Sequence, residues 1–393
     1  MNDAIQAFER HFGSSPAQTV RAPGRVELLG NHTDYNQGLV MALAVDRYIS
    51  LAVAPRPDDT VELISTAYEE PARFALDDLA KDPAAPWANY TKGLLVQLRE
   101  RGVRFGGFNA AIHSTVPLGG GLSSSAALLV SSALAVRKLY PYVLHADGSG
   151  ESVESPAPPM TDPERMALAK ACQAAENRFV GVNCGLLDHI SSLFGRAHQV
   201  IRIDCLHLTV DWAPLPADLE VVVCHSGVRH ALVGGEYNQL RAHCESAARS
   251  LGVDALRFVS PEALEAGRGR LSERDYQCAR HIVGENDRVQ RGATALEAND
   301  LATFGEFLFA SHASSRDHFH NSCPELDVLV ELAREHPGCI GARLTGGGFG
   351  GATLNLVHAT EARSFREHIA MAYEARTGQR LESWICQVVD GAA

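Results

Sequence analysis

The chain has 393 residues, of which 46% are hydrophobic and 21% charged, so it can bury a sizeable core and is unlike a disordered or fibrous sequence. At roughly 100–200 residues per domain, this length predicts two domains. The formal net charge of −12 argues against a nucleic-acid partner, because such binding needs clustered Lys and Arg to displace counterions.

In the first half of the chain, extended and helical patterns alternate. β-branched and apolar residues predict a buried strand over Val40 to Val53, which Pro55 ends. Helical spacing follows over Trp87 to Glu100, and then an alternation typical of a strand over Phe108 to Val116. A glycine-rich loop and an Ala-rich helix to about Leu139 come next.

From residue 140 onward the chain has a linker and then mostly helical patterns. A Gly- and Pro-rich stretch at 140–163 is interpreted as a surface insertion, and a helix is expected from an N-cap at Asp162 through Phe179. Strands are predicted over Gln199 to Asp204 and Leu219 to His225. The further predicted helices are Glu236 to Leu251, Asp275 to Ala298 and Asp300 to Phe309.

Membrane insertion and metal or disulfide scaffolds are not predicted. No run of 18 or more apolar residues occurs, and the first ten residues lack the basic and apolar segments of a signal peptide, so we expect a cytoplasmic protein without a membrane partner. The nine cysteines form no close Cys-x-x-Cys pair, and the 17 histidines show no ligand spacing to them. Neither a disulfide framework nor a zinc site is therefore expected.

The first cluster with chemical character lies between a predicted strand and a predicted helix and reads Pro117-Leu118-Gly119-Gly120-Gly121-Leu122-Ser123-Ser124-Ser125-Ala126. Consecutive glycines let backbone N–H groups approach an anion, and a helix N-terminus adds donors and a favourable dipole. A triphosphate would fit there, although a glycine turn with a serine N-cap has a similar pattern. The run matches neither the P-loop nor the Gly-x-Gly-x-x-Gly motif.

Two other clusters suggest a ligand site. The segment Ala22 to Asn36 holds one Arg, one His, one Asp and two Asn, and such side chains can hydrogen-bond several hydroxyls of a polyol. An Asx-rich turn is the alternative. Five of the six residues from Gly346 to Gly351 are glycine, which indicates either a backbone crowded by a ligand or a structural hairpin.

In this order and at these separations, the three clusters resemble the three signature motifs of the GHMP kinases, and Gly24 to Asn36 resembles the galactokinase branch of that superfamily. Motifs similar to that branch extend over nearly the whole chain: Trp87 to Tyr90, Cys184 to Asp188, Ser226 to His230, Glu236 to Asn238 and Ser322 to Asp327. The resemblance implies an α+β fold with a ribosomal-protein-S5-domain-2-like N-terminal lobe, assigned to 1–210, and a ferredoxin-like C-terminal lobe, assigned to 211–393.

The resemblance also implies an enzyme. It would be an ATP-dependent sugar 1-kinase that transfers the γ-phosphate of ATP to the anomeric hydroxyl of galactose with the help of Mg²⁺, working as a monomer. Two alternatives stay open: a kinase for N-acetylgalactosamine, arabinose or galacturonate, and a sugar sensor without catalysis. The presence of Ser125-Ala126, Glu176 and Asp188 argues against the sensor.

By the same resemblance, Asp188 matches the catalytic aspartate and Arg25 the arginine beside it. Whether Asp188 acts as a base or as an electrostatic anchor stays open. The matched sugar-contacting positions are Asn31, His32, Asp34, Gly185 and Tyr237. The residues matched to the nucleotide are Trp87 near the adenine and Gly119, Gly120, Gly121, Leu122, Ser123, Ser124 and Ser125 around the phosphates. Mg²⁺ is matched to Ser125 and Glu176.

Three positions depart from the galactokinase pattern. Asn31 stands where the family has a glutamate that contacts the hydroxyl at carbon 6, and Glu27 stands where asparagine is usual, so the two residue types look exchanged. We interpret this as rewired hydrogen bonding around the same sugar, while a 6-deoxy sugar, a pentose or a uronic acid stays open. His189 replaces the usual glutamine after Asp188, with an effect that the sequence leaves open.

Overall fold

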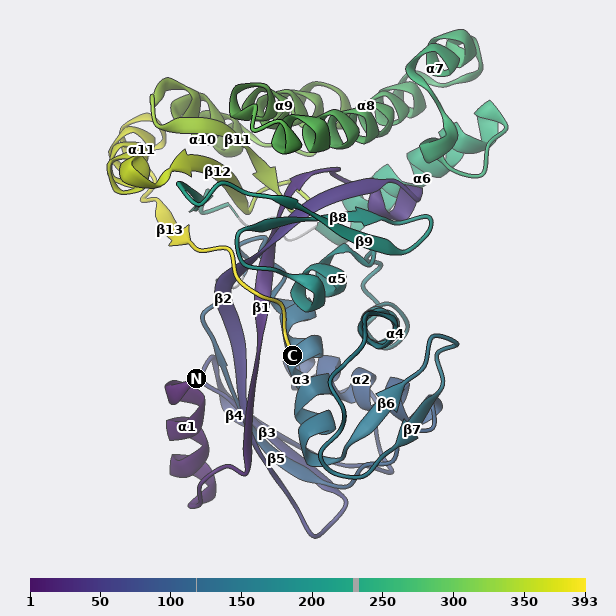
Figure 1. Ribbon diagram of the computed structural model, residues 1–393, viewed down its shortest axis with the longest axis vertical. Helices are drawn as coiled ribbons and strands as arrows, with labels where there is room; N and C mark the ends of the chain where they lie inside the picture. The colour runs from purple at the N-terminus through teal and green to yellow at the C-terminus, as the bar shows by residue number, and fades with distance from the viewer. Residues whose placement is uncertain (118, 229–232) are drawn as a thin grey trace.

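The computed structural model describes residues 1–117, 119–228 and 233–393 (Figure 1). Leu118 of the first glycine cluster and Arg229 and His230 of the motif Ser226 to His230 lie outside the described residues. Within the described part, the strands form a seven-stranded sheet, a four-stranded sheet and a two-stranded hairpin. None of the described helices combines the length and the apolar character needed to span a membrane.

The larger sheet has the order β4-β3-β5-β2-β8-β9, with β1 paired to β2. Its strands are β1 (Gln18–Leu29), β2 (Leu39–Pro55), β3 (Thr60–Ser65), β4 (Tyr68–Ala75), β5 (Phe108–Ser114), β8 (Gln199–Asp204) and β9 (Thr209–Pro214). Strand β2 is long enough to pair with β5 through its second half and with β8 through its first residues. It therefore connects the sheet from end to end.

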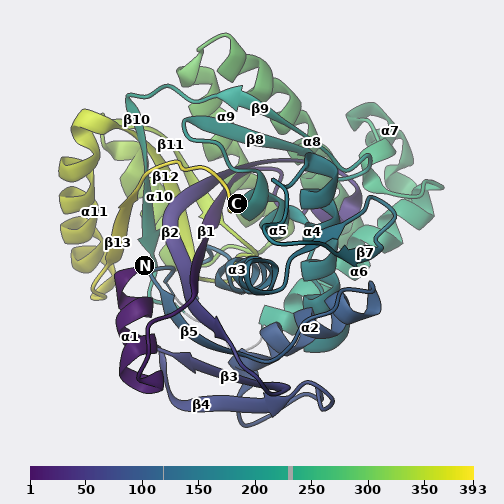
Figure 2. The same ribbon diagram turned by 60° about the horizontal axis from the view of Figure 1, so that its bottom comes forward.

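Helices cover both faces of this sheet (Figures 1 and 2). Helix α1 (Asn2–Phe12) packs Phe8 on Ala52 and Ala111, which point away from the main core because side chains alternate along a strand. On the other face, α3 (Ser124–Leu139) and α5 (Leu187–Phe194) pack on β1 and β2. Helix α2 (Asn89–Glu100) packs on α3, and α4 (Asp162–Ala174) packs on α3 and α5. The hairpin β6 (Tyr142–Leu144) and β7 (Gly150–Ser152) lies within the predicted insertion.

The smaller sheet is fully antiparallel, with the order β11-β12-β10-β13. Its strands are β10 (Leu219–His225), β11 (Cys339–Thr345), β12 (Ala352–His358) and β13 (Glu382–Cys386), and α11 (Ala362–Thr377) joins β12 to β13. This is the strand order of the expected ferredoxin-like lobe, with a helical region in place of its first helix. That region contains α6 (Val233–Leu251), α7 (Pro261–Gly267), α8 (Glu273–Glu297), α9 (Leu301–Ser314) and α10 (Pro324–Glu335).

Several predicted bounds change in the structure. The N-cap of α4 is Thr161, whose hydroxyl accepts a hydrogen bond from the Glu164 N–H, so the prediction of Asp162 as N-cap is wrong by one residue. The helix does not continue regularly to Phe179, because residues Ala175–Val180 form a π-helical segment. Strand β9 carries the first sheet to Pro214, past the residue-210 boundary assigned from the sequence.

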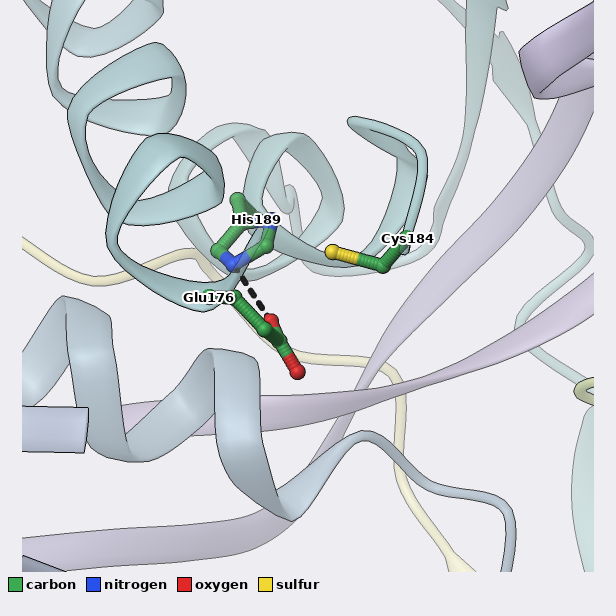
Figure 3. A group of neighbouring side chains, drawn as sticks. All are labelled: Glu176, Cys184 and His189. Carbon is green, nitrogen blue, oxygen red and sulfur yellow. Dashed lines mark ion pairs between the residues drawn. The ribbon is translucent and has the colours of Figure 1, made fainter. Parts of the chain in front are cut away.

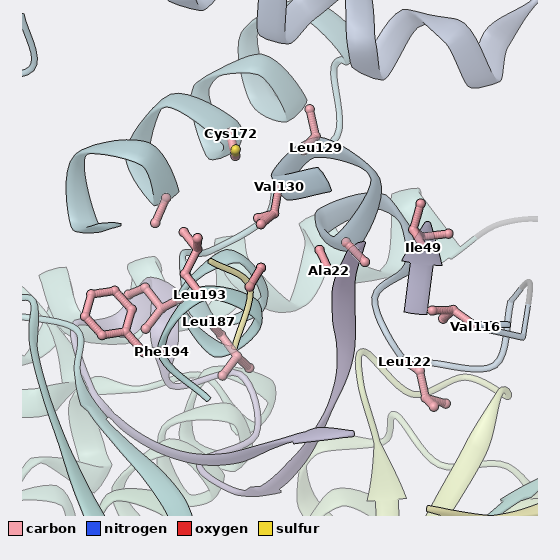
Figure 4. Packing of buried hydrophobic residues seen from close by; sticks show 14 of the residues in the cluster. Ala22, Ile49, Val116, Leu122, Leu129, Val130, Cys172, Leu187, Leu193 and Phe194 are labelled. Atoms are coloured by element: carbon pink, nitrogen blue, oxygen red, sulfur yellow. The ribbon is translucent and has the colours of Figure 1, made fainter. Parts of the chain in front are cut away.

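Helix α5 is held in place by the main core (Figure 4). Its apolar residues Leu187, Ile190 and Leu193 are buried against α3, α4 and β1. The hydroxyl of Ser192 also donates a 2.7 Å hydrogen bond to the carbonyl of Pro23 in β1. The first turn of α5, which contains Asp188, is thereby fixed relative to β1.

Candidate functional site

A cavity of about 380 Å³ lies where β1, the loop before α5, the start of α6 and the β11–β12 turn meet. This volume falls in the range of roughly 300–1,000 Å³ that is typical of small-ligand sites. All seven residues matched to the catalytic and sugar-contacting positions line it: Arg25, Asn31, His32, Asp34, Gly185, Asp188 and Tyr237. The third glycine cluster is the turn of a β11–β12 hairpin, and it also contributes Gly346 and Gly347 to the wall.

Arg25 and Asp188 form an ion pair at one side of this cavity. The Arg25 Nε and Nη2 atoms lie 2.8 and 2.7 Å from Asp188 Oδ1, and Nη1 donates to the carbonyl of Gly121 at 2.6 Å. Two irregularities in the register of β1 with β2, after Pro23 and after Glu27, flank Arg25. Such bulges change the direction of side chains along a strand. Here they flank the buried Arg25, which contacts both Asp188 in α5 and the carbonyl of Gly121 in the first glycine cluster.

Ser123 was predicted among the phosphate-contacting residues, and its hydroxyl donates a 2.5 Å hydrogen bond to Asp188 Oδ2. The backbone reaches this position through left-handed conformations at Gly119, Gly121 and Ser123, and α3 begins at the next residue. The free N–H groups of the first turn of α3 therefore lie beside the Arg25–Asp188 pair. An anion at this helix end would meet both the helix dipole and Arg25.

Asp34 and Gly185 contact each other inside the cavity. Asp34 Oδ1 accepts a hydrogen bond from the Tyr35 N–H at 2.9 Å. Burial, together with the negative charges of Glu27 and Asp188, raises the pKa of Asp34 to about 7. A Cβ atom on Gly185 would lie 1.7 Å from Asp34 Oδ2, so only glycine is compatible with this carboxylate position.

His32 is buried and neutral. Burial lowers the pKa of His32 to about 4. Its Nε2 atom donates to the carbonyl of Gly347 at 3.0 Å, which leaves Nδ1 to accept from the Tyr35 hydroxyl at 2.9 Å. The rings of Tyr35 and Tyr237 lie 5.6 and 4.9 Å from the His32 ring. Both ring nitrogens of His32 therefore make hydrogen bonds within the protein. His32 lines the cavity with its ring and has no free nitrogen for a ligand.

The exchanged pair Glu27 and Asn31 is in direct contact. Asn31 Nδ2 donates to Glu27 Oε1 at 3.1 Å and to the carbonyl of Gly346 at 2.9 Å, and its Oδ1 accepts from Asn321 at 3.0 Å. The Glu27 carboxylate also accepts from Arg343 Nη1 at 3.0 Å. Both Glu27 and Asn31 line the cavity. This part of the wall therefore still has a carboxylate, that of Glu27, although residue 31 is an asparagine.

Glu285 of α8 supports the site and was not anticipated. Its Oε2 accepts 2.8 Å hydrogen bonds from the backbone N–H groups of Gly30 and Asn31, and its Oε1 accepts from Arg288 Nε at 2.7 Å. Burial alone would raise the pKa of Glu285, but the neighbouring groups Arg288, His281 and Arg343, together with the hydrogen bond from the Asn31 N–H, outweigh it and hold this pKa well below its usual range. No local pattern links Glu285 to the site, because the backbone groups of Gly30 and Asn31 that it accepts from lie more than 250 residues earlier.

Replacing Glu285 by glutamine is expected to lower the free energy of unfolding by about 3–5 kcal/mol, because Arg288 loses its buried counter-charge. Thermal unfolding followed by circular dichroism measures the change. The control is Glu306→Gln, which alters an exposed pair with Arg334 and should be nearly neutral. Equal stability of the two variants would contradict a supporting role for Glu285.

The remaining predicted residues lie outside the wall of the cavity. Trp87 stacks on Tyr68, with ring centroids 5.4 Å apart and an interplanar angle of 6°. Ser125 is partly exposed in the first turn of α3, and Glu176 is buried in the π-helical segment. A hydroxyl and a carboxylate are oxygen donors of the kind that Mg²⁺ prefers, so the donor chemistry of these two residues fits that ion.

Family models match three parts of the chain. They are described as the galactokinase galactose-binding signature, over residues 6–55, the GHMP kinases N terminal domain, over 89–196, and the GHMP kinases C terminal, over 293–375. Curated galactokinases of Roseiflexus sp. (strain RS-1) and Homo sapiens are 41% and 40% identical to this chain. The two alignments cover 98% and 99% of this chain, respectively, and 95% of each relative.

Solved structures agree with the family models. A crystal structure of Lactococcus lactis galactokinase complexed with galactose matches with a TM-score of 0.89 at 30% identity, covering 99% of this chain and 98% of that chain. A mevalonate kinase structure, 15% identical with a TM-score of 0.63, covers 95% of this chain and 100% of that chain and shares the fold. The expected two-domain fold of mixed α and β structure is confirmed.

Proposed function

Because the chain belongs to the galactokinase family of the GHMP kinases, we propose that it transfers the γ-phosphate of ATP to the anomeric hydroxyl of galactose, forming galactose 1-phosphate and ADP. The observation that carries this proposal is that one cavity, of about 380 Å³, is lined by every residue matched to catalysis and sugar contact. We further propose that it acts in the cytoplasm as a monomer.

The residues around the cavity suit phosphoryl transfer. Asp188 would orient the anomeric hydroxyl and take up its proton as the new phosphorus–oxygen bond forms and the bond to the β-phosphate breaks. Arg25 holds Asp188 and faces the first glycine cluster, where it would offset the charge that develops on the transferred group. The N–H groups of the first turn of α3 would hold the phosphates.

The metal and the nucleotide base have their own candidate residues. Ser125 and Glu176 would hold Mg²⁺, which, when bound, neutralises phosphate charge during transfer. Trp87, already stacked on Tyr68, would lie near the adenine. These roles follow from residue type and from family resemblance, and they are proposals for this chain.

The contact between Glu27 and Asn31 favours a sugar with a hydroxyl at carbon 6, such as galactose, over arabinose, a 6-deoxy sugar or galacturonate. The Asn31 side chain is tied to Glu27, Gly346 and Asn321, while the Glu27 carboxylate lines the same wall. We propose that Glu27, on β1, accepts the hydrogen bond from the sugar hydroxyl that in the family is accepted by the glutamate at position 31, in the turn after β1. A negatively charged uronic acid would be repelled by this carboxylate.

The test is ADP release by the purified protein with ATP, Mg²⁺ and a panel of galactose, 6-deoxygalactose, N-acetylgalactosamine, arabinose and galacturonate. Galactose should have the highest kcat/KM. Loss of the hydrogen bond to the hydroxyl at carbon 6 should cost 6-deoxygalactose about 10–100-fold, as hydrogen bonds to charged groups contribute about 1.5–3 kcal/mol. Arabinose or galacturonate turned over as well as galactose would overturn the assignment, and no turnover with any sugar would favour the sensor.

Replacing Gly185 by alanine should raise the KM for galactose about 10–100-fold, because the new methyl group must displace the Asp34 carboxylate. Steady-state kinetics with galactose as the varied substrate measure the effect. Gly269→Ala is the matched control, since a Cβ at Gly269 meets no atom within 4 Å. An unchanged KM in Gly185→Ala would show that the position of Asp34 does not matter for the sugar.

A further inference from the structure

A second group of potential ligands lies directly behind the start of α5. The side chains of Glu176, Cys184 and His189 point toward one another, and their ligand atoms all lie within 4.8 Å of one another (Figure 3). They come from the π-helical segment, the following loop and the third residue of α5. The spacing along the sequence did not suggest such a group, and among the described residues this is the one cluster of its kind.

His189 has no hydrogen-bond partner in this group. Its side chain is fully buried, yet neither ring nitrogen makes a hydrogen bond within the described residues. Nε2 lies 3.1 Å from Glu176 Oε2, which is an ion-pair distance without the direction of a hydrogen bond. A buried polar group without a hydrogen-bond partner costs about 1–3 kcal/mol. A buried imidazole without a partner in the protein therefore points to a partner from outside the chain, such as a water molecule or an ion.

We propose that Glu176, Cys184 and His189 form a binding site for a divalent transition metal of the Zn²⁺ type. A carboxylate oxygen, a thiolate sulfur and an imidazole nitrogen are ligands for Zn²⁺ or Co²⁺, whereas Mg²⁺ takes oxygen ligands. Ligand atoms around a tetrahedral ion lie roughly 3.3–3.7 Å apart, so the side chains need to close by on the order of 1 Å. Three protein ligands leave a fourth position open.

The site has a consequence for catalysis, which rests on the proposed function. Glu176 is the residue proposed for Mg²⁺, and His189 directly follows Asp188. An ion held by Cys184 and His189 takes the Glu176 carboxylate away from Mg²⁺. Zn²⁺ therefore competes with Mg²⁺ for Glu176 in this protein. This competition depends on His189, which stands where the family has glutamine.

Spectroscopic titration of the chelator-treated protein with Co²⁺ tests the site without any activity measurement. One equivalent of Co²⁺ should give visible d–d bands and a thiolate-to-cobalt charge-transfer band, and Zn²⁺ should abolish both. Cys184→Ser should lose the charge-transfer band, and His189→Gln should bind Co²⁺ about 10–100-fold more weakly. Cys323→Ser, which alters a partly buried cysteine at the start of α10, should keep the spectrum.

Two results would overturn the proposal: no thiolate band in the wild-type protein, as expected if only water satisfies His189, or an unchanged band in Cys184→Ser. Circular dichroism confirms that the variants fold. In a separate assay at fixed free Mg²⁺, Zn²⁺ should inhibit galactose phosphorylation by the wild type much more than by His189→Gln. Equal inhibition would refute the competition, whereas a Co²⁺ spectrum without any turnover would refute the proposed function and leave the metal site standing.

Discussion

Replacing Asp188 by asparagine is expected to lower kcat for galactose phosphorylation about 10²–10⁴-fold, the range that a positioned proton acceptor contributes. Asparagine has the same shape, and its one side-chain oxygen can still accept from Arg25, which contacts Asp188 Oδ1 at 2.7–2.8 Å. Its NH2 group would take the place of Oδ2 and would donate to the Ser123 hydroxyl, which donates to Asp188 in the wild type. The sugar should therefore still bind, so KM should change little. Steady-state kinetics and isothermal titration with galactose separate the two effects.

The comparison of kcat with the affinity for ATP addresses whether Asp188 is a base or an anchor. If Asp188 only fixes Arg25 by its charge, Asp188→Asn should reduce kcat and also lower the affinity for ATP, because Arg25 loses its fixed position beside the glycine cluster. If it accepts the proton, kcat falls alone. Asp254→Asn, at an exposed position, is the control. Full activity in Asp188→Asn would exclude both roles.

Replacing Asp34 by asparagine should have opposite effects on stability and on binding. The folded protein raises the pKa of Asp34 to about 7, so the carboxyl group favours folding below about pH 4, and this contribution is lost as the pH rises to about 7. At pH 8 the ionised Asp34 therefore destabilises the free protein. Asp34→Asn should raise the free energy of unfolding at pH 8 by on the order of 1–3 kcal/mol and have little effect at pH 4.

The same variant should bind galactose about 10–100-fold more weakly at pH 8, because an ionised acceptor for sugar hydroxyls is lost. The wild-type KM for galactose should fall as the pH rises from 6 to 8, and Asp34→Asn should lack this dependence. Thermal unfolding and kinetics at several pH values measure both effects, with Asp77→Asn at an exposed turn as control. If Asp34→Asn were less stable than the wild type at pH 8, the ionised Asp34 carboxylate would not be destabilising in the folded protein.

Much of the fold could be predicted where the signal was local. The bounds of β8 and β10 are those predicted, and β2, β5, α3, α6, α8 and α9 lie within a few residues of their predictions. Strand β1 was missed. Its residues from Ala22 onward are nearly all buried on both faces, so it lacks the alternation that marks a strand, and it contains the charged Arg25 and Glu27.

The charges of β1 are tolerated because distant residues match them. Arg25 pairs with Asp188, 163 residues later, and Glu27 pairs with Arg343, 316 residues later. No window of sequence contains both members of either pair. The cavity wall could be anticipated from motif residues, but the network that orients each wall residue could not.

By itself, the sequence determined what depends on residue type and near neighbours: the glycine clusters, because only glycine readily adopts their backbone conformations, the strongly periodic elements, and the motifs that identify the family. Only the tertiary structure decided which charges meet. It showed Glu27 beside Asn31, Glu285 under the Gly30–Asn31 backbone, Ser123 on Asp188, and His189 facing Glu176 and Cys184. Those contacts join segments far apart in the chain, and packing of the whole core sets their geometry.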